Sequence, residues 1–126
     1  MVFITDKKIL IVEDEIIIAL ELEYRLKAMG YSVCGIAASG EKAILLVKET
    51  KPNLVLMDIN LRGNMNGIQT ADIIKDDFSI PSVYLTAYSD ESTVNQIKSS
   101  KNHEFLFKPY AERELQGVIE KTIGDE

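Results

Sequence analysis

Five polar side chains in this chain follow short hydrophobic runs, and their types suit one kind of chemistry. They are Glu13 and Asp14 after residues 9–12, Asp58 after 54–57, Thr86 after 83–85, and Lys108 after 105–107. If the runs are parallel strands of one sheet, all five side chains meet at its carboxyl edge, where open α/β folds bind ligands. Clustered carboxylates with one nearby ammonium group suit a hard divalent cation and a phosphoryl group.

The acidic side chains at this edge predict a magnesium site. Mg²⁺ prefers oxygen ligands, keeps several waters and usually takes one or two protein carboxylates plus a phosphate oxygen. We expect Asp14 and Asp58 to be direct ligands and Glu13 to hold a metal-bound water. The carbonyl of Asn60, two residues beyond Asp58, is expected to turn toward the same ion.

Asp58 is also placed as a nucleophile, because a carboxylate can attack phosphorus and form an aspartyl phosphate. Without metal, three adjacent negative charges would repel an incoming phosphoryl group. The cation offsets that repulsion, and Lys108 offers a further positive contact to the phosphoryl oxygens. Thr86 can donate a hydroxyl hydrogen bond to the same group. The predicted catalytic residues are therefore Asp58, Lys108 and Thr86.

Length and composition predict a single domain over residues 1–126, with its core at about 7–123 and no output domain. The formal net charge of −6 argues against a nucleic-acid partner. Cys34 is the only cysteine, which excludes an internal disulfide, and no secretory signal begins the chain, so a reducing cytoplasm is expected. The apolar run Ile16–Leu20 is too short to span a bilayer, so no membrane association is predicted.

The pattern of apolar residues alternates between strand and helix along the whole chain. Strands are expected at 8–12, 31–37, 54–57, 82–85 and 104–107, and helices at about 15–29, 39–49, 68–77, 89–100 and 111–123. Asp14 is predicted to cap the first helix and Gly30 to end it. Five strands alternating with five helices predict right-handed crossovers and an α/β, (βα)5 three-layer sandwich around a five-stranded parallel sheet.

Four motifs occupy the ends of the strands that carry the polar side chains. They read ILIVED at 9–14, LVLMD at 54–58, YLTAY at 84–88 and FLFKP at 105–109. With them the chain resembles a receiver domain of two-component response regulators. The resemblance implies a flavodoxin-like fold and Mg²⁺-dependent phosphoryl transfer to Asp58 from a histidine kinase or a histidine phosphotransfer protein. It implies a regulatory phosphoacceptor rather than an enzyme, one that catalyses only its own phosphorylation and dephosphorylation and acts on a downstream protein effector.

The resemblance also implies roles for particular residues. Thr86 and Phe105 become coupled switch residues that alter a face around the fourth helix, fifth strand and fifth helix. The resemblance further implies that the Lys108–Pro109 peptide bond is cis and that this places the lysine in the site. Asn60 and Tyr88 border the path of the hydrolytic water. A phosphorylation-dependent homodimer is compatible with this scheme, and the sequence names neither the kinase nor the effector.

Several positions depart from the family's pattern. Glu13 stands where aspartate is commoner, so we expect an altered metal affinity. Arg62 stands where proline is usual, in a loop at 61–67 that is one residue longer than the common form, which leaves the entry to the third helix undetermined. Lys101 and Asn102 replace the usual Gly-Ala pair before the last strand.

The first predicted helix carries two apolar stripes. Ile18, Leu22, Leu26 and Met29 form the expected core face, and Ile16, Ile17, Leu20 and Tyr24 form a second stripe. The second stripe either packs under neighbouring loops or is a docking patch for the partner's histidine-bearing helices, with Ile17, Ile18 and Leu20 at its centre. The helix at 89–100 has few apolar anchors, chiefly Val94 and Ile97, so it is expected to be mobile.

Three other functions compete with the phosphoacceptor. An aspartate-nucleophile phosphatase needs a second acid two residues after the nucleophile, where this chain has Asn60. A flavin-binding module needs a Ser/Thr/Gly-rich loop after the first strand, where this chain has Glu13, Asp14 and Glu15. A pseudo-receiver that binds partners without phosphorylation stays open as the alternative, in case the loop that carries Arg62 closes the site.

Overall fold

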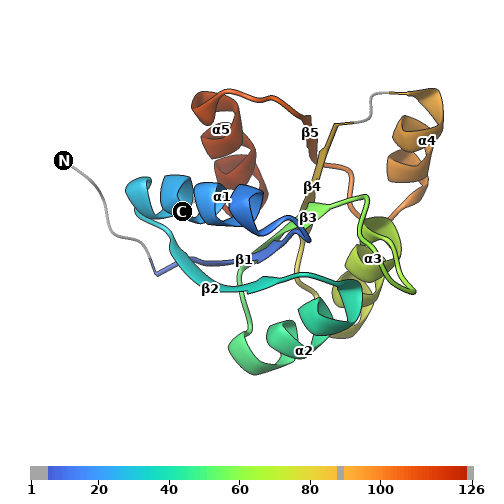
Figure 1. The fold of residues 1–126 in the computed structure, drawn as a ribbon, viewed down its shortest axis with the longest axis horizontal. Coiled ribbons are helices and arrows are strands. Elements are labelled where there is room, and N and C mark those ends of the chain that lie inside the picture. Colours follow the sequence, from blue (N-terminus) through green and yellow to red (C-terminus); the bar gives the residue numbers. More distant parts are fainter. Residues whose placement is uncertain (1–5, 88–89, 125–126) are drawn as a thin grey trace.

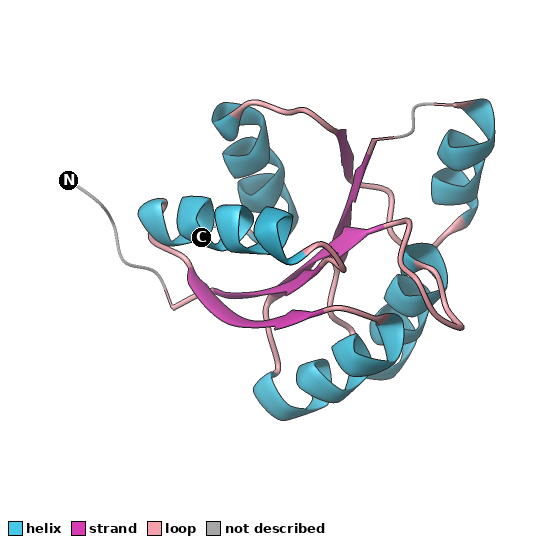
Figure 2. Cartoon of the chain, viewed as in Figure 1, coloured by secondary structure: helices cyan, strands magenta, loops and turns pink. Residues whose placement is uncertain are grey.

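The computed structural model describes residues 6–87 and 90–124 as five strands and five helices in strict alternation (Figures 1 and 2). The strands are β1 (Lys8–Val12), β2 (Ser32–Ala37), β3 (Leu54–Asp58), β4 (Ser82–Thr86) and β5 (Phe105–Phe107). The helices are α1 (Ile16–Ala28), α2 (Gly40–Thr50), α3 (Gly67–Phe78), α4 (Glu91–Ser99) and α5 (Glu112–Ile123). Strand order in the sheet is β2-β1-β3-β4-β5, and all pairs are parallel. The predicted α/β architecture is confirmed.

Helices cover both faces of the sheet and make three layers (Figure 1). Helices α1 and α5 pack on one face and build a core with Ile9, Ile11, Leu54, Leu56, Val83 and Leu85. Helices α2, α3 and α4 pack on the other face against Leu10, Val12, Val55, Met57 and Tyr84. Successive strand residues point to opposite faces, so β1, β3 and β4 contribute to both cores. Burial on both faces explains why these strands are continuous apolar runs.

The start of α1 differs from the prediction. Asp14 was expected to cap this helix, but the N-cap residue is Glu15, and its side chain makes no capping hydrogen bond. The carboxylate of Asp14 instead forms an ion pair with Arg62, because it lies at the sheet edge among the other acidic groups. The end of the helix agrees with the prediction, since Gly30 follows the C-cap with a positive φ of 98°.

The entry to α3 is well formed despite the unusual loop before it. Asn66 is the N-cap, and its side-chain oxygen accepts a hydrogen bond from Gln69 N at 2.9 Å, while Gln69 Oε1 accepts one from Asn66 N at 2.9 Å. Gly67 begins the helix directly against β3, because its N–H donates to the carbonyl of Ile59 at 2.9 Å. A Cβ on Gly67 would overlap the backbone carbonyl of Asp58.

Helix α4 is anchored mainly at its C-terminal end. Ile97 is its one buried residue and Val94 is half-buried, as expected for a lightly held helix. Beyond the helix, Ser100 Oγ accepts a hydrogen bond from the buried Tyr84 hydroxyl at 3.1 Å. Asn102 is buried, and its side chain accepts from Ser82 N at 3.0 Å. The turn after α4, where Lys101 and Asn102 replace the family's usual Gly-Ala pair, is therefore linked to β4 by side-chain hydrogen bonds. No helix among the described residues could cross a membrane.

Candidate functional site

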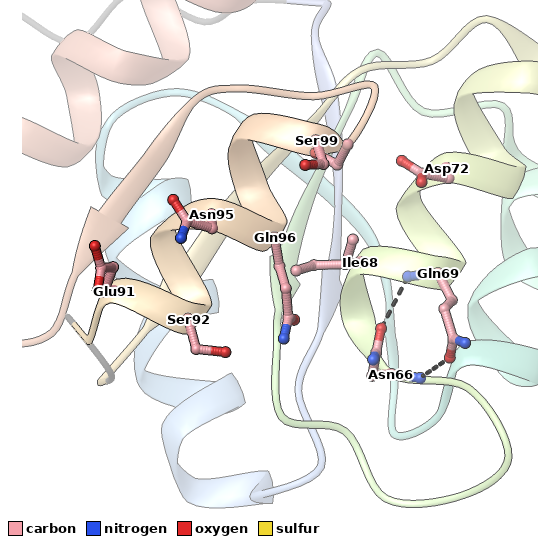
Figure 3. Close-up of a pocket in the computed structure, with 10 residues that line it drawn as sticks. Asn66, Ile68, Gln69, Asp72, Glu91, Ser92, Asn95, Gln96 and Ser99 are labelled. Atoms are coloured by element: carbon pink, nitrogen blue, oxygen red, sulfur yellow. Dashed lines mark hydrogen bonds between the residues drawn. The ribbon is translucent and has the colours of Figure 1, made fainter.

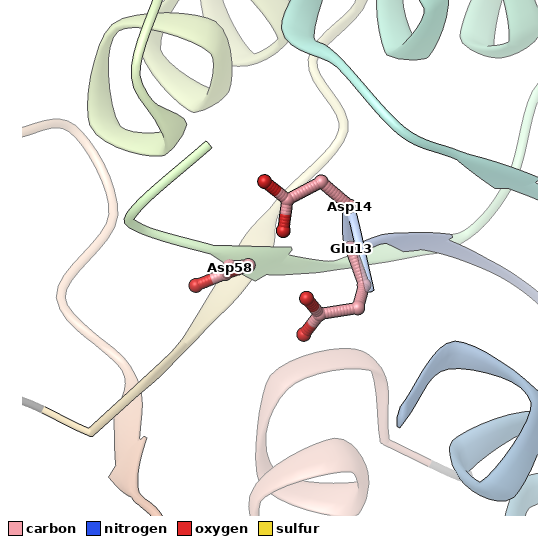
Figure 4. Close-up of side chains that lie close together, drawn as sticks. All are labelled: Glu13, Asp14 and Asp58. Atoms are coloured by element: carbon pink, nitrogen blue, oxygen red, sulfur yellow. The ribbon is translucent and has the colours of Figure 1, made fainter. Parts of the chain in front are cut away.

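Three carboxylates converge at the carboxyl edge of the sheet (Figure 4). Glu13 and Asp14 follow β1 and Asp58 ends β3, and these strands are neighbours whose register pairs Val12 with Met57. One oxygen from each carboxylate lies within 4.8 Å of the other two. The predicted meeting of the acidic groups therefore occurs, and the parallel register is what brings together residues 44 or more positions apart.

Lys108 reaches the same edge from β5. Its Nζ lies 3.2 Å from Glu13 Oε1, and Glu13 is only 5% exposed. Two backbone features hold the lysine here: its N–H donates to the Thr86 carbonyl at 2.8 Å, and the Lys108–Pro109 peptide is cis. The other oxygen of Glu13 accepts from Glu15 N at 3.1 Å. Glu13 is thus fixed on both of its oxygens.

Asp58 is buried and binds its proton more tightly than an ordinary aspartate. The pKa of its carboxyl is raised from 3.8 to about 6, chiefly by burial and then by the negative charge of Glu13, whereas Lys108 opposes the shift. Asn60 N donates to Asp58 Oδ1 at 3.1 Å and also favours the charged form. A divalent cation here would offset the acidic repulsion and restore the ionised nucleophile.

Thr86 and Phe105 lie on neighbouring strands but not side by side. Thr86 is fully buried at the end of β4, next to the backbone of Lys108. Phe105 begins β5, pairs in register with Tyr84, and packs at its edge against Phe107 with ring centroids 5.1 Å apart. Phe105 is half-buried. Tyr88, the other residue predicted to border the water path, lies outside the described residues.

Arg62 adds a second cation to the site. Its Nε lies 3.3 Å from Asp14 Oδ2. Arg62 and Asp14 line a small pocket of about 280 Å³ together with Glu15, Asp58, Asn60, Ala87 and Lys108. Asp58 is thus both buried and in contact with an open pocket that carries two cationic side chains.

The Response regulator receiver domain family matches residues 9–120 of the chain. The chain belongs to this family. Among its relatives, the transcriptional regulatory protein PdtaR of Mycobacterium tuberculosis is 32% identical over 118 residues, which cover 94% of this chain and 57% of PdtaR. The phyllosphere-induced regulator PhyR of Methylorubrum extorquens is 30% identical, over 92% of this chain and 43% of PhyR. The receiver domain spans about half the length of these curated relatives.

Solved structures agree with this assignment. The signal receiver domain of a modulated diguanylate cyclase from Desulfovibrio desulfuricans has a TM-score of 0.85 and 32% identity, over 92% of each chain. The N-terminal domain of a response regulator/sensory box/GGDEF protein from Carboxydothermus hydrogenoformans has a TM-score of 0.83 and 37% identity, over 93% of this chain and 94% of that one. The flavodoxin-like receiver fold is therefore confirmed.

The donor set of this receiver domain fits Mg²⁺. It consists of carboxylate oxygens only; Asp14 and Asp58 line the pocket, and Glu13 is buried. The division into two direct ligands, Asp14 and Asp58, and one water-holding acid, Glu13, stays a prediction. Asn60 is exposed on the pocket wall. Its carbonyl as a ligand stays a prediction.

The second apolar stripe of α1 is exposed rather than packed under loops. The exposed fractions are 57% for Ile16, 79% for Ile17, 50% for Leu20 and 76% for Tyr24. We call these four residues the α1 patch. Ile18, predicted with Ile17 and Leu20 as a docking residue, is half-buried and lines a small cavity with Pro109 and Tyr110. It belongs to the inner side of the helix.

Two features of the site were not predicted from the sequence. Gly67 was read only as the end of a loop, yet its missing side chain lets α3 begin on the backbone of Asp58. Arg62 was noted as a departure from the family pattern, but its pairing with Asp14 was not foreseen. The signal in the sequence was a positively charged side chain four residues after the candidate nucleophile, which could have suggested an ion pair with one of the acids.

Proposed function

We propose that this receiver domain accepts a phosphoryl group on Asp58 from a phosphohistidine, in a reaction that needs Mg²⁺. The observation that carries the proposal is the cluster of three carboxylates with Lys108 beside it, at a pocket that Asp14, Asp58 and Lys108 line. Bound Mg²⁺ would supply charge neutralisation for the phosphoryl oxygens and the carboxylates. The donor would be a histidine kinase or a histidine phosphotransfer protein. Because the phosphoryl group of such donors comes from ATP, the proposed location is the cytoplasm.

Each residue of the site has a distinct part in this proposal. An oxygen of Asp58 attacks phosphorus and forms a P–O bond, while the P–N bond to the donor histidine breaks and its electron pair returns to the imidazole, which takes up a proton. Lys108, which now pairs with Glu13, would turn to a phosphoryl oxygen. Thr86, buried at the end of β4, would offer its hydroxyl to the same group. Glu13 and Asp14 would hold the metal with Asp58.

The readout of phosphorylation is proposed to run through Thr86 and Phe105. Phe105 is half-buried on the short edge strand β5, and α4 beside it is held chiefly by Ile97, so both can change position at low cost. A phosphoryl group adds charge and strong acceptors at Asp58, which biases such an element. The altered α4–β5–α5 face would then bind a downstream protein effector or a second phosphorylated copy.

The α1 patch supports the donor-docking part of the proposal. Its four apolar side chains are exposed on a helix whose first residue lies two positions after Asp14. Apolar groups exposed together at one side of an acidic pocket fit the apolar face of a partner's helix better than they fit water. Ile17 is the most exposed of the four.

Intact-mass spectrometry after incubation with a small phosphodonor tests the proposal. The wild type should gain one phosphoryl group with Mg²⁺ and none with EDTA, and Asp58→Asn should gain none. Asp77→Asn is the matched control, because it makes the same carboxylate-to-amide change at an exposed position on α3. This variant should label like the wild type. An adduct on Asp58→Asn, or labelling that ignores Mg²⁺, would remove Asp58 or the metal from the mechanism.

A pseudo-receiver that binds partners without phosphorylation is the second candidate. The ion pair between Arg62 and Asp14 favours it, because the guanidinium covers one of the proposed metal ligands. Folded wild-type protein that gains no phosphoryl group from any donor would support this alternative.

A further inference from the structure

Arg62 and Asp14 form an ion pair at the mouth of the proposed metal site. The two atoms, Arg62 Nε and Asp14 Oδ2, are 3.3 Å apart. The side chain of Asp14 is 12% exposed, whereas that of Arg62 is 85% exposed. The aspartate is therefore fixed at the sheet edge, while the arginine reaches it from solvent and can leave at little cost in packing.

The two positively charged side chains of the site pair with different carboxylates. Lys108 pairs with Glu13 at 3.2 Å and Arg62 pairs with Asp14 at 3.3 Å, so these two acids have different cationic partners. Arg62 and Asp58 line the same pocket. A divalent cation bound at Asp14 would have to take the oxygen that the guanidinium now contacts, and it would repel the guanidinium at such short range.

We propose that Arg62 is a counter-ion that competes with Mg²⁺ for Asp14, so that the guanidinium and the metal alternate at this carboxylate. The inference rests on the proposed metal site and assigns a regulatory part to a residue outside the ligand set. In the metal-free protein, Arg62 reduces repulsion among the three carboxylates. When metal binds, the arginine is released to solvent or to the phosphoryl oxygens, for which its fork of donors is suited.

The expected size of the effect follows from the exposure of Arg62. Ion pairs with one exposed partner contribute little, which corresponds to a roughly two- to fivefold change in an equilibrium constant. Removing the arginine should therefore strengthen Mg²⁺ binding by about two- to fivefold at low ionic strength. The gain should shrink when salt is added, because the pair is exposed on one side and salt screens it.

Isothermal titration of Mg²⁺ into the metal-free full chain measures the competition directly. Arg62→Gln should bind more tightly than the wild type, and Arg62→Lys should lie between them because the charge remains without the fork. Lys101→Gln is the matched control: it removes one positive charge and one exposed ion pair, with Asp76 at 3.1 Å. Lys101 precedes β5, at the opposite edge of the sheet, so this variant should bind Mg²⁺ like the wild type.

Thermal unfolding supplies a second readout that does not depend on activity. In EDTA, Arg62→Gln should unfold at a lower temperature than the wild type, and the difference should disappear in saturating Mg²⁺ because the metal then occupies Asp14. In an Asp14→Asn background, Arg62→Gln should have no effect in either condition, since the partner of the arginine is already gone.

The outcomes separate this inference from the proposed function. Tighter binding by Arg62→Gln alone, by about two- to fivefold, supports the competition. Equal binding by wild type and Arg62→Gln, or the same gain in Lys101→Gln, overturns the competition while leaving the metal site intact. No heat of binding in any folded variant overturns both the competition and the Mg²⁺ dependence of the proposed function.

Discussion

The ionisation of Asp58 is needed for its proposed role but is opposed by its surroundings. As a proposed nucleophile it must be ionised, yet burial and the neighbouring charge of Glu13 raise its pKa to about 6. In the absence of metal, ionising this carboxyl therefore costs folding free energy. The folded state binds the proton more tightly than the unfolded state does, so the wild type loses stability as pH rises from about 4 to about 6, and the loss is complete above that range.

The first prediction follows from this linkage. In EDTA at pH 7.5, Asp58→Asn should be more stable than the wild type by about 2 kcal/mol, because the amide carries no charge to bury. The advantage should fade as pH falls through about 6 and be lost below the ordinary pKa of 3.8, where the wild-type carboxyl is protonated in both the folded and the unfolded state. Urea denaturation at several pH values measures it. Asp77→Asn should show no comparable advantage, and a pH-independent difference for Asp58→Asn would contradict the assigned cause.

Gly67 gives the second prediction, again from a single residue. Gly67→Ala places a methyl group against the backbone carbonyl of Asp58, so we expect a loss of about 1–3 kcal/mol and slower phosphoryl transfer to the displaced carboxylate. Gly117→Ala is the control on α5, where an added Cβ meets nothing within 4 Å. It should be neutral or stabilising by up to about 1 kcal/mol. Equal effects of the two substitutions in urea would refute the close approach.

At the scale of elements, α1 and α4 differ in how they are held. Helix α1 buries Ala19, Leu22 and Leu26 against the sheet and still exposes an apolar patch on its other side. Helix α4 buries Ile97 only. The first helix can therefore bind a partner without moving, whereas the second can move without a large loss of buried surface.

The third prediction concerns the α1 patch. Ile17→Glu should slow phosphoryl transfer from the cognate donor protein by about tenfold, because it puts a charge at the centre of an apolar contact. Labelling by a small phosphodonor should be unchanged. Leu45→Glu is the matched control, since Leu45 is 59% exposed on α2, on the opposite face of the sheet. A loss of both kinds of labelling would point to a folding defect instead of docking.

The fourth prediction concerns α4. Its backbone amides should exchange hydrogen earlier than those of α3, a helix that buries Ile68, Ala71 and Ile74. Within α4 the exchange should begin at the end nearer Glu91, because the Tyr84–Ser100 hydrogen bond anchors the other end. Exchange measured by mass spectrometry on peptides of the two helices tests this order. Simultaneous protection of α3 and α4 would argue against α4 as the moving element.

At the scale of the whole molecule, the sheet joins the two cores into one folding unit. Leu56 and Met57 are adjacent in β3, and they point into the α1/α5 core and the α2/α3/α4 core respectively. Loss of either core therefore exposes the other face of the same strands. Such coupling favours a single cooperative unfolding transition.

The fifth prediction tests this coupling. Leu56→Ala and Met57→Ala should each cost about 2–5 kcal/mol, because each leaves a cavity beside a fully buried strand. In both variants the urea midpoints from tyrosine fluorescence and far-ultraviolet circular dichroism should shift together. Separate midpoints in either variant would show that the cores unfold independently.

The fold and the chemical groups of the site were predictable because they depend on local pattern. Apolar runs marked the five strands, and the parallel order carried Glu13, Asp58 and Lys108 to one edge. Contacts between exposed or loop residues were not predictable. The partner of Arg62 lies 48 positions away, and the buried role of Asn102 depends on where β4 and α3 pass the turn. Such pairings arise only when the elements have packed.

The division of the interior by the sheet has a consequence for how this protein can diversify. Helix α1 and the side chains that α4 packs against lie on opposite faces of the five-stranded sheet. A substitution in the α1 patch changes no atom that supports α4. If donors dock on the α1 patch as proposed, surface mutation there would change the choice of donor without loosening the core on which α4 rests.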